Sequence, residues 1–545
     1  MSTCWSVECQ GKRAAVPHGR TPLTPPSVAL KRGRNMYRGL LPVSRRTVLG
    51  VGAAGAVVAA GSTIALWPGG STSGPPVLPD SEAVLAAERA RTATGGVVKR
   101  TLTAAPTSLD LGGRVVDTWA FGSSLPGATI RATAGDRLSV TLINSLPAPT
   151  SLHWHGLALR NDMDGVPGLT QTAVPSAQTY RYDFVLPDPG TYWFHPHYGV
   201  QLDTGLYAPL IVEDPNEEGS YDEEVVIVLD DWTDGWSATP DAILANFKAE
   251  GMAGMDGMDG MDGMDMSGDV SAQEPLGSDT GDVTYPAHLI NGLLPAAPHV
   301  IRSRPGRLLR LRVINAASDT AYRFAIGGHG LTVTHTDGFP TQAVDVDTLI
   351  IGMGERYDLI VELRDGTFPV VAQPEGKDDP PALAVLTSSE GAVRFTEERP
   401  SVSELSGRLL SYNDLVAASS AELAPRAVDR ELEMTLTMGK GGREWLINGR
   451  TYADREPLDV VQGERVRLTM TNNSPMFHPM HLHGHTYALS RPDGRGPRKD
   501  TVNVLPMATT VVEFDANNPG QWLAHCHNIY HGELGMMTSV SYVGP

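Results

Sequence analysis

A ten-residue pattern of apolar and polar positions occurs three times along the chain. Each copy reads Gly-x-x-apolar-x-apolar-x-apolar-x-Asn, and the copies occupy residues 135–144, 306–315 and 463–472. Apolar residues at every second position after a turn glycine are typical of a strand with one face in a core and the other toward solvent. Because a repeated pattern marks a repeated structural unit, the chain is predicted to contain three similar β domains.

The repeats divide the 545-residue chain into an N-terminal extension and three expected domains. A chain of this length is large enough for several domains, each with a buried core. We expect an all-β fold in which a signal segment and a linker precede the first domain. The expected limits are 1–94 for the extension, signal and linker, and 95–220, 221–400 and 401–545 for the three domains.

Histidines gather beside the outer two copies of the repeat. Ten of the sixteen lie in four short motifs, and His153 follows Asn144 by the same nine residues that separate His481 from Asn472. Alternate side chains of a strand point to one face, so each His-x-His presents two imidazoles together. The outer domains are therefore expected to meet around metal. The motifs are His153-Trp154-His155-Gly156, His195-Pro196-His197, His478-Pro479-Met480-His481-Leu482-His483-Gly484 and His525-Cys526-His527-Asn528-Ile529-Tyr530-His531.

Cys526 lies between two of these histidines and is expected to point away from them, toward a separate metal. A blue copper centre uses two histidines, a cysteine thiolate and a weak axial methionine. The residues in place for such a site are His478, Cys526, His531 and Met536. The same register in the first domain reads Thr150, Pro196, Gln201 and Leu206, so no second site of this kind is expected there.

Together the four motifs resemble those of the multicopper oxidases, the family of laccases and copper-resistance oxidases, over roughly residues 95–545. The resemblance implies three cupredoxin-like Greek-key domains and four copper ions, one of type 1, one of type 2 and two of type 3. It assigns the type 2 copper to His153 and His481. It assigns one type 3 copper to His155, His195 and His525, and the other to His197, His483 and His527.

The resemblance also implies two candidate proton carriers. Asp164, in the stretch after the first motif, matches the family's acidic residue that helps to deliver protons to dioxygen. Many bacterial members place a glutamate directly after the last type 1 histidine. Here Gly532 has that position and Glu533 follows it, so a relay role for Glu533 stays open.

The implied reaction passes single electrons from a reductant through Cys526 to a cluster that reduces dioxygen to two waters. Two kinds of reductant remain open at this point: cuprous ion, in copper tolerance, and phenols or aromatic amines, as in a general laccase. A non-catalytic copper-binding protein is a weaker alternative, because storage needs no dioxygen-reducing cluster.

A low-complexity insert interrupts the expected second domain. Residues 251–266 repeat Gly-Met-Asp and contain six methionines but no histidine. Such a segment can be a plain acidic loop, but solvated methionines are costly and soft thioethers select cuprous ion. We favour copper capture. Met476, two residues before His478, is open to two interpretations, packing or reception of cuprous ion.

Charge and targeting agree with an exported oxidase. The formal charge is −19, which argues against nucleic-acid binding. Arg45-Arg46, followed by the uncharged stretch 50–67, resembles a twin-arginine signal, so we expect an extracytoplasmic location reached through the twin-arginine export machinery. Cleavage and an N-terminal membrane tether both stay open. Cys4 and Cys9 precede this signal, so no disulfide framework is expected in the mature chain.

Overall fold

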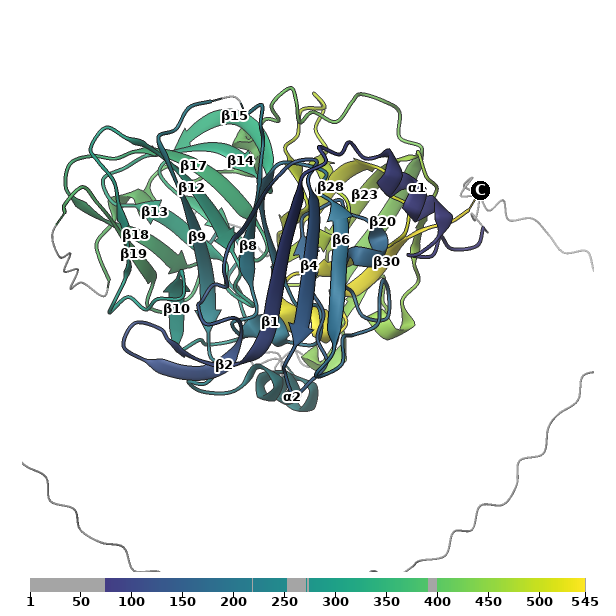
Figure 1. Cartoon of the computed structure of the whole chain (residues 1–545), viewed down its shortest axis with the longest axis horizontal. Coiled ribbons are helices and arrows are strands. Elements are labelled where there is room, and N and C mark those ends of the chain that lie inside the picture. The colour runs from purple at the N-terminus through teal and green to yellow at the C-terminus, as the bar shows by residue number, and fades with distance from the viewer. Residues whose placement is uncertain (1–73, 218, 252–270, 272–273, 391–398, 545) are drawn as a thin grey trace, which may run out of the picture. The chain divides into compact units, whose positions relative to one another are not determined.

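Six β-sheets, two in each of three domains, form the framework of the described chain (Figure 1). The computed structural model describes residues 74–217, 219–251, 271, 274–390 and 399–544. The predicted twin-arginine segment and residues 252–266 of the methionine-rich insert lie outside these residues. Among the helices that the structure does describe, none is long and apolar enough to cross a membrane.

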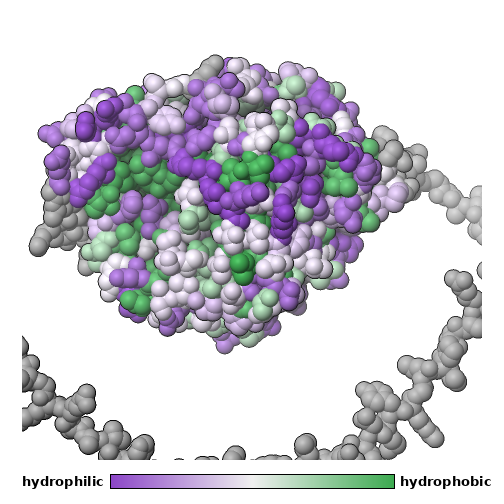
Figure 2. All heavy atoms as spheres, viewed as in Figure 1, coloured by the Kyte–Doolittle hydropathy of each residue, from purple (hydrophilic) through white to green (hydrophobic). Residues whose placement is uncertain are grey.

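The first domain has sheets with strand orders β2-β1-β4-β6 and β3-β8-β7-β5. Hydrophilic residues gather over the upper part of β1, β4 and β6 in Figure 2, as expected for the outward face of a half-buried sheet. The strands are β1 (Val97–Asp110), β2 (Val115–Phe121), β3 (Ile130–Thr133), β4 (Arg137–Asn144), β5 (His153–His155), β6 (Thr179–Val185), β7 (Gly190–His195) and β8 (Ala208–Glu213).

The second domain has sheets with orders β10-β9-β12-β17-β14-β15 and β11-β19-β18-β13-β16. Its strands are β9 (Glu223–Trp232), β10 (Ala287–Ile290), β11 (His299–Arg302), β12 (Leu308–Asn315), β13 (Tyr322–Ile326), β14 (Leu331–Thr336), β15 (Phe339–Val346), β16 (Leu349–Ile351), β17 (Arg356–Glu362), β18 (Thr367–Pro374) and β19 (Ala382–Thr387).

The third domain has sheets with orders β21-β20-β23-β28-β25-β26 and β22-β30-β29-β24-β27. Its strands are β20 (Arg430–Met438), β21 (Trp445–Ile447), β22 (Leu458–Val460), β23 (Arg465–Asn472), β24 (His478–Leu482), β25 (Tyr487–Leu489), β26 (Arg498–Lys499), β27 (Thr501–Val504), β28 (Thr509–Asp515), β29 (Gln521–Cys526) and β30 (Met537–Tyr542). The boundary between the first and second domains lies between β8 and β9, and the boundary between the second and third lies between β19 and β20. The residue limits of the domains stay a prediction.

Helices are few and short. Thr239 caps α2 by accepting a hydrogen bond from the Ala242 N–H, and Asn528 caps α3 by accepting from two N–H groups, one of them that of His531. The helices are α1 (Glu82–Ala90), α2 (Pro240–Glu250) and α3 (Ile529–Glu533), with 3-10 turns η1 (Asn161–Met163), η2 (Gln201–Asp203), η4 (Ser403–Ser406), η5 (Tyr412–Asp414), η6 (Lys440–Gly442) and η7 (Tyr452–Asp454).

The three copies of the repeat form equivalent strands, β4, β12 and β23. Each lies parallel to the first long strand of its own domain, which is β1, β9 or β20. The predicted inward positions are at most 2% exposed in all three copies. These positions are Leu138, Val140, Leu142, Leu309, Leu311, Val313, Val466, Leu468 and Met470.

The asparagine that ends each copy holds the following turn. In the middle domain the Oδ1 of Asn315 accepts from the Ala317 N–H at 2.9 Å, and its Nδ2 donates to the carbonyl oxygens of Thr320 and Ile351. Asn144 and Asn472 make the same kinds of contact. In the outer domains, this turn leads into the histidine motifs.

Asn315→Ala is expected to lower the free energy of unfolding by about 3 kcal/mol. The change leaves two carbonyls and one N–H without their buried partner, and each such group costs about 1–3 kcal/mol. Chemical denaturation measures the loss, with the exposed Asn473→Ala as a control expected to stay within about 0.5 kcal/mol of the unmodified protein. A loss below about 1 kcal/mol would mean that the side chain does not hold the turn.

One strand is more buried than its pattern predicts. The outward positions of β12 are Arg310 and Arg312, which are only 3% and 2% exposed. Both pair with Asp358, and Arg312 also donates to Thr191 Oγ1 of the first domain. The second face of this sheet therefore packs against the first domain. Each buried arginine on it is paired with a carboxylate, because an unpaired buried charge would be costly.

The cores show which domains share an interior. One cluster of buried apolar side chains contains residues of the first and third domains, while the middle domain has its own. Polar contacts also join the outer domains, since Asn161 Nδ2 donates to the Gln521 carbonyl and Asn518 Nδ2 to the Leu159 carbonyl. The outer domains thus form one packed unit, and the histidine motifs lie along their boundary.

Candidate metal centre

Four strands bring the histidine motifs together between the first and third domains. β5 pairs antiparallel with β7, with His153 opposite His195, and β24 pairs antiparallel with β29, with His481 opposite His525. The two outer domains therefore pair their equivalent histidines in the same way, as the matched spacing predicts.

Imidazole rings from the two domains interleave. His153 stacks on His483 and His155 stacks on His481, in each case with ring centroids 3.8 Å apart. Seven of the eight rings are at most 4% exposed, and His197 is partly exposed. Buried polar rings in such number need partners for their nitrogens.

The ring nitrogens are divided between protein contacts and the centre of the cluster. The Nδ1 atoms of His153, His195, His481 and His525 each lie 2.8–2.9 Å from a backbone carbonyl oxygen. Among the described residues, the buried Nε2 atoms of His153, His195 and His481 have no hydrogen-bond partner. A metal-bound imidazole commonly donates its other N–H to a carbonyl or carboxylate. The donor set therefore fits a metal cluster.

The surroundings keep most of these imidazoles neutral, which is the form that binds metal. Burial first, and the proximity of other imidazoles second, lowers their pKa well below the ordinary value for histidine. This holds for His155, His195, His197, His483, His525 and His527.

The ring of His525 lies beside those of His197 and His483. Its Nε2 lies 3.4 Å from that of His197 and 3.1 Å from that of His483. Three converging nitrogens within 4.8 Å of one another can hold one ion.

His527 lies on the other side of the cluster. Its ring centroid is 4.9 Å from that of His155 and 5.4 Å from that of His195. β29 ends at Cys526, so His527 lies beyond the strand, where its N–H donates to the Pro479 carbonyl. The division implied by the sequence resemblance was therefore wrong in one respect: it exchanged His525 and His527 between the two type 3 groups.

A separate group forms on the opposite face of β29. The Nδ1 atoms of His478 and His531 are 3.1 Å apart, and the Cys526 Sγ lies 3.7 Å from each. All three side chains are fully buried. The cysteine thus points away from its neighbouring histidines, as the alternation of strand side chains predicts.

Met536 is tied to this group through its backbone. Its carbonyl accepts from the Cys526 N–H at 3.0 Å, and its N–H donates to the His531 carbonyl at 2.9 Å. Its side chain is fully buried. Trp445 packs on the ring of His531, with centroids 4.3 Å apart. The group is shielded from water on this side.

The first domain fills the equivalent position without metal-binding side chains. Thr150 and Gln201, which correspond to His478 and His531, hydrogen-bond to each other at 2.7 Å. Leu206, which corresponds to Met536, is fully buried. A hydroxyl and an amide thus close the space that two imidazoles occupy in the third domain.

Asp164 lies where the sequence resemblance places it, beside the cluster. Its side chain is fully buried, and its Oδ2 lies 3.0 Å from the Nδ1 of His483. Its Oδ1 lies 3.2 Å from the Nδ1 of His153. One carboxylate therefore contacts histidines of both domains.

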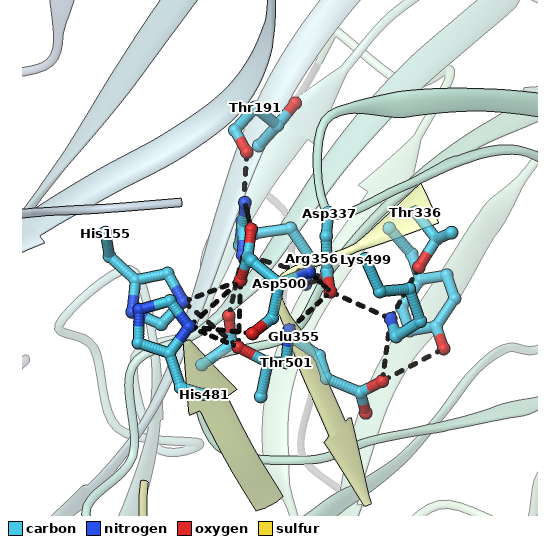
Figure 3. A network of polar contacts seen from close by, with 12 residues as sticks. His155, Thr191, Thr336, Asp337, Glu355, Arg356, His481, Lys499, Asp500 and Thr501 are labelled. Carbon is cyan, nitrogen blue, oxygen red and sulfur yellow. Dashed lines mark hydrogen bonds and ion pairs between the residues drawn. The ribbon is translucent and has the colours of Figure 1, made fainter. Parts of the chain in front are cut away.

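A second carboxylate, Asp500, was not predicted. Its Oδ1 lies 3.1 Å from the Nε2 of His155, and its backbone oxygen lies 2.9 Å from the Nδ1 of His481 (Figure 3). It belongs to no histidine motif. The only signal in the sequence is a charged pair, Lys499-Asp500, directly before an apolar alternating stretch.

Glu533 faces elsewhere. Burial raises its pKa, and the charges that act on it are Lys248 and Asp241 of α2. α3 therefore directs this carboxylate toward α2.

Three further residues near the motifs have structural contacts. Met476 and Met480 are buried in the core shared by the outer domains, at 1% and 2% exposed, which favours packing over reception of cuprous ion. His485 Nε2 lies 2.7 Å from the hydroxyl of Tyr542. His485 is therefore held outside the cluster.

Comparisons with known proteins identify the family. Models of the multicopper oxidase family match residues 104–217, 223–391 and 425–543. The multicopper oxidase MmcO of Mycobacterium tuberculosis is 44% identical over 85% of this chain and 90% of its own length. Copper resistance protein A of Pseudomonas syringae pv. tomato is 27% identical over 79% of this chain and 90% of its own length.

A solved structure has the same fold. The crystal structure of Fet3p, described as a multicopper oxidase that functions in iron import, matches with a TM-score of 0.68 and 22% identity, covering 82% of this chain and 90% of that one. Three cupredoxin-like domains, the paired histidine motifs and these matches lead to one conclusion. The chain belongs to the multicopper oxidase family, whose members are copper-dependent oxidoreductases.

Proposed function

We propose that the protein oxidises cuprous ion with dioxygen, in copper tolerance, and uses four copper ions to do so. The type 1 copper is assigned to His478, Cys526, His531 and Met536. The type 2 copper is assigned to His153 and His481. The type 3 coppers are assigned to His155, His195 and His527, and to His197, His483 and His525. When bound, these ions supply one-electron steps that together reduce dioxygen to water.

The protein's part in electron transfer is the covalent link at Cys526. The thiolate belongs to one group, while the next residues on either side, His525 and His527, reach into the other. An electron entering at the buried Cys526 thus has a short through-bond path to both type 3 groups.

Asp164 is proposed to handle protons at the cluster. Its oxygens lie within 3.2 Å of the Nδ1 atoms of His153 and His483. The reduction of dioxygen to water consumes protons, and a positioned carboxylate beside the reacting centre is suited to deliver them.

Acidic groups beside His531, a proposed type 1 ligand, support a cationic donor. Asp282 Oδ2 lies 2.8 Å from the Nε2 of His531 and is nearly buried. Asp279 is partly exposed and forms a backbone bridge with Met476, two residues before His478. A carboxylate pair at this position attracts a small cation and offers it oxygen ligands.

Described residues before and after the methionine-rich insert lead toward the same group. At one end, Gly251 lies against Gly441, in the turn between β20 and the strand that carries Trp445. At the other end, the chain continues into Asp279 and Asp282. Soft thioethers tethered at these points would raise the local concentration of cuprous ion at its oxidation site.

Oxidation of phenols and aromatic amines is the second candidate. Asp282 favours it, because a carboxylate beside His531 can accept the proton that a phenol loses. The contact with Asp282 occupies the Nε2 edge of His531, however, and a phenol would need that edge for direct electron transfer. We therefore rank cuprous ion first. An extracytoplasmic location, reached by twin-arginine export, is part of the same proposal.

Asp279→Asn is expected to lower kcat/KM for cuprous ion about tenfold and to leave that for a neutral phenol within about twofold. Burial first, and the charge of Asp282 second, raises the pKa of Asp279 to about 6. The carboxylate therefore gains its charge as the pH rises through about 6. Cuprous oxidation by the unmodified protein should increase over this range, and the variant should lack that increase. Dioxygen uptake measures both substrates.

The matched control is Asp365→Asn, which removes the same charge from an exposed turn between β17 and β18 of the same domain. This control should leave kcat/KM unchanged for both cuprous ion and the phenol. Equal losses for cuprous ion and phenol in Asp279→Asn would count against capture of a cation at this site and in favour of the general oxidase.

A further inference from the structure

Arg356 of the middle domain makes a fully buried, two-pronged contact with Asp500 of the third. The Nη1 and Nη2 atoms each lie 2.7 Å from one carboxylate oxygen of Asp500 (Figure 3). The Nε donates to the carbonyl of Thr191, in the first domain, at 3.0 Å. One guanidinium thus joins all three domains, and its planar fork fixes the orientation of the carboxylate.

Asp500, whose carboxylate Arg356 holds, contacts the histidine cluster at two points, one through its side chain and one through its backbone. Its Oδ1 lies 3.1 Å from His155 Nε2, and the backbone oxygen of the same residue lies 2.9 Å from His481 Nδ1. In the ligand sets proposed above, His155 belongs to a type 3 copper and His481 to the type 2 copper. The placement of Asp500 therefore sets the tilt of imidazoles at two different metals.

Other buried charges leave Asp500 a single position. Asp337 accepts hydrogen bonds from the N–H groups of Asp500 and Thr501, each at 3.2 Å. Lys499 Nζ lies 3.0 Å from both Asp337 and Glu355. The side chains of Asp337, Glu355, Lys499 and Asp500 are fully buried, so displacing one leaves another without its partner.

The loop that carries Arg356 also touches the cluster directly. At Gly354, which has a φ of +84°, a Cβ would lie 2.9 Å from both His155 Cε1 and His527 Cδ2. The middle domain thus packs bare backbone against two imidazoles and places its arginine two residues later. This domain contributes none of the predicted ligands, yet its loop forms one wall of the cluster.

We propose that Arg356 is a positioning residue of the trinuclear cluster: acting through Asp500, it orients His155 and His481 for copper. The proposal rests on the ligand sets given under the proposed function. It predicts that loss of Arg356 damages the cluster and spares the type 1 site, because among the described residues no hydrogen bond or ion pair joins Cys526, His478 or His531 to this network.

The test compares Arg356→Gln, Arg356→Lys and the control Arg312→Gln in the full-length protein. Arg312 is an equally buried arginine on β12 that contacts Thr191 and pairs with Asp358, so its loss weakens the same domain boundary without touching Asp500. Copper per chain, the blue absorption of type 1 copper and the electron paramagnetic resonance spectrum of type 2 copper are measured for each.

Arg356→Gln is expected to keep the blue absorption, to lose or alter the type 2 spectrum, and to bind copper at the cluster about 10–100-fold more weakly. Arg356→Lys keeps the charge but lacks the fork, and should recover part of the type 2 signal. Arg312→Gln should keep the unmodified spectrum, whatever its thermal stability.

A type 2 spectrum like that of the unmodified protein in either Arg356 variant would overturn the proposal, and Arg356→Lys serves alone if the glutamine variant does not fold. Equal damage to the cluster in Arg312→Gln would also overturn it, since the effect would then belong to the domain boundary. If the unmodified protein shows no type 2 signal, the proposed copper sites fail instead.

Discussion

Cys526→Ser is expected to abolish the blue colour and all dioxygen turnover while the eight-histidine cluster keeps its copper. The intense colour of a type 1 centre comes from its bond to a thiolate, and a serine hydroxyl does not replace that bond. The Cys526 Sγ lies 3.7 Å from the Nδ1 atoms of both His478 and His531, so it is the thiolate available to this group. Visible absorption and copper analysis should show no blue band and one copper fewer per chain.

The matched control is Met480→Leu. Met480 lies directly opposite Cys526 across β24 and β29 and is 2% exposed, but it belongs to no proposed ligand set. Its exchange for a residue of similar volume should keep the colour. A blue Cys526→Ser protein would refute the type 1 assignment, and a colourless Met480→Leu protein would show that any disturbance of this strand pair removes the copper.

Asp164→Asn is expected to slow steady-state dioxygen reduction by about 100-fold or more, the usual contribution of a general acid or base. Asparagine keeps the shape of the side chain but carries no transferable proton. Entry of electrons should be unaffected, because Asp164 contacts histidines of the cluster and not His478, Cys526 or His531. Anaerobic bleaching of the blue band by the reductant should therefore keep its rate while dioxygen uptake falls.

Glu533→Gln is the control for this experiment. The charges that act on Glu533 are those of Lys248 and Asp241, on α2, so its neutralisation should leave dioxygen uptake within about twofold. The opposite ranking, with Glu533→Gln slow and Asp164→Asn normal, would transfer the proton role to Glu533.

Much of the fold and the site could be predicted because each depends on local patterns. Turn glycines and alternating apolar residues define β4, β12 and β23, and the inward positions of all three strands are buried. Alternation also separates Cys526 from its neighbouring histidines. Spacing from Asn144 and Asn472 placed His153 and His481 at equivalent positions, and the structure brings their motifs together.

The features that were missed depend on long-range packing. His525 and His527 lie on one face of the chain, so the sequence does not reveal which neighbours each meets. Only the packing of the two domains shows that His525 meets His197 and His483, and that His527 meets His155 and His195. Asp500 and Arg356 are 144 residues apart in sequence and meet only when the middle domain docks. A charged residue in the sequence carries no sign of a partner so far along the chain.

The most direct test of the proposed reaction is the number of one-electron donors consumed for each dioxygen. Purified protein is supplied with excess cuprous ion, and dioxygen uptake, cupric product and hydrogen peroxide are measured together. A cluster built from the eight histidines, fed through Cys526, predicts four cuprous ions oxidised per dioxygen, with water as the product and no peroxide. Two per dioxygen with peroxide released, or no uptake by the copper-loaded protein, would contradict it.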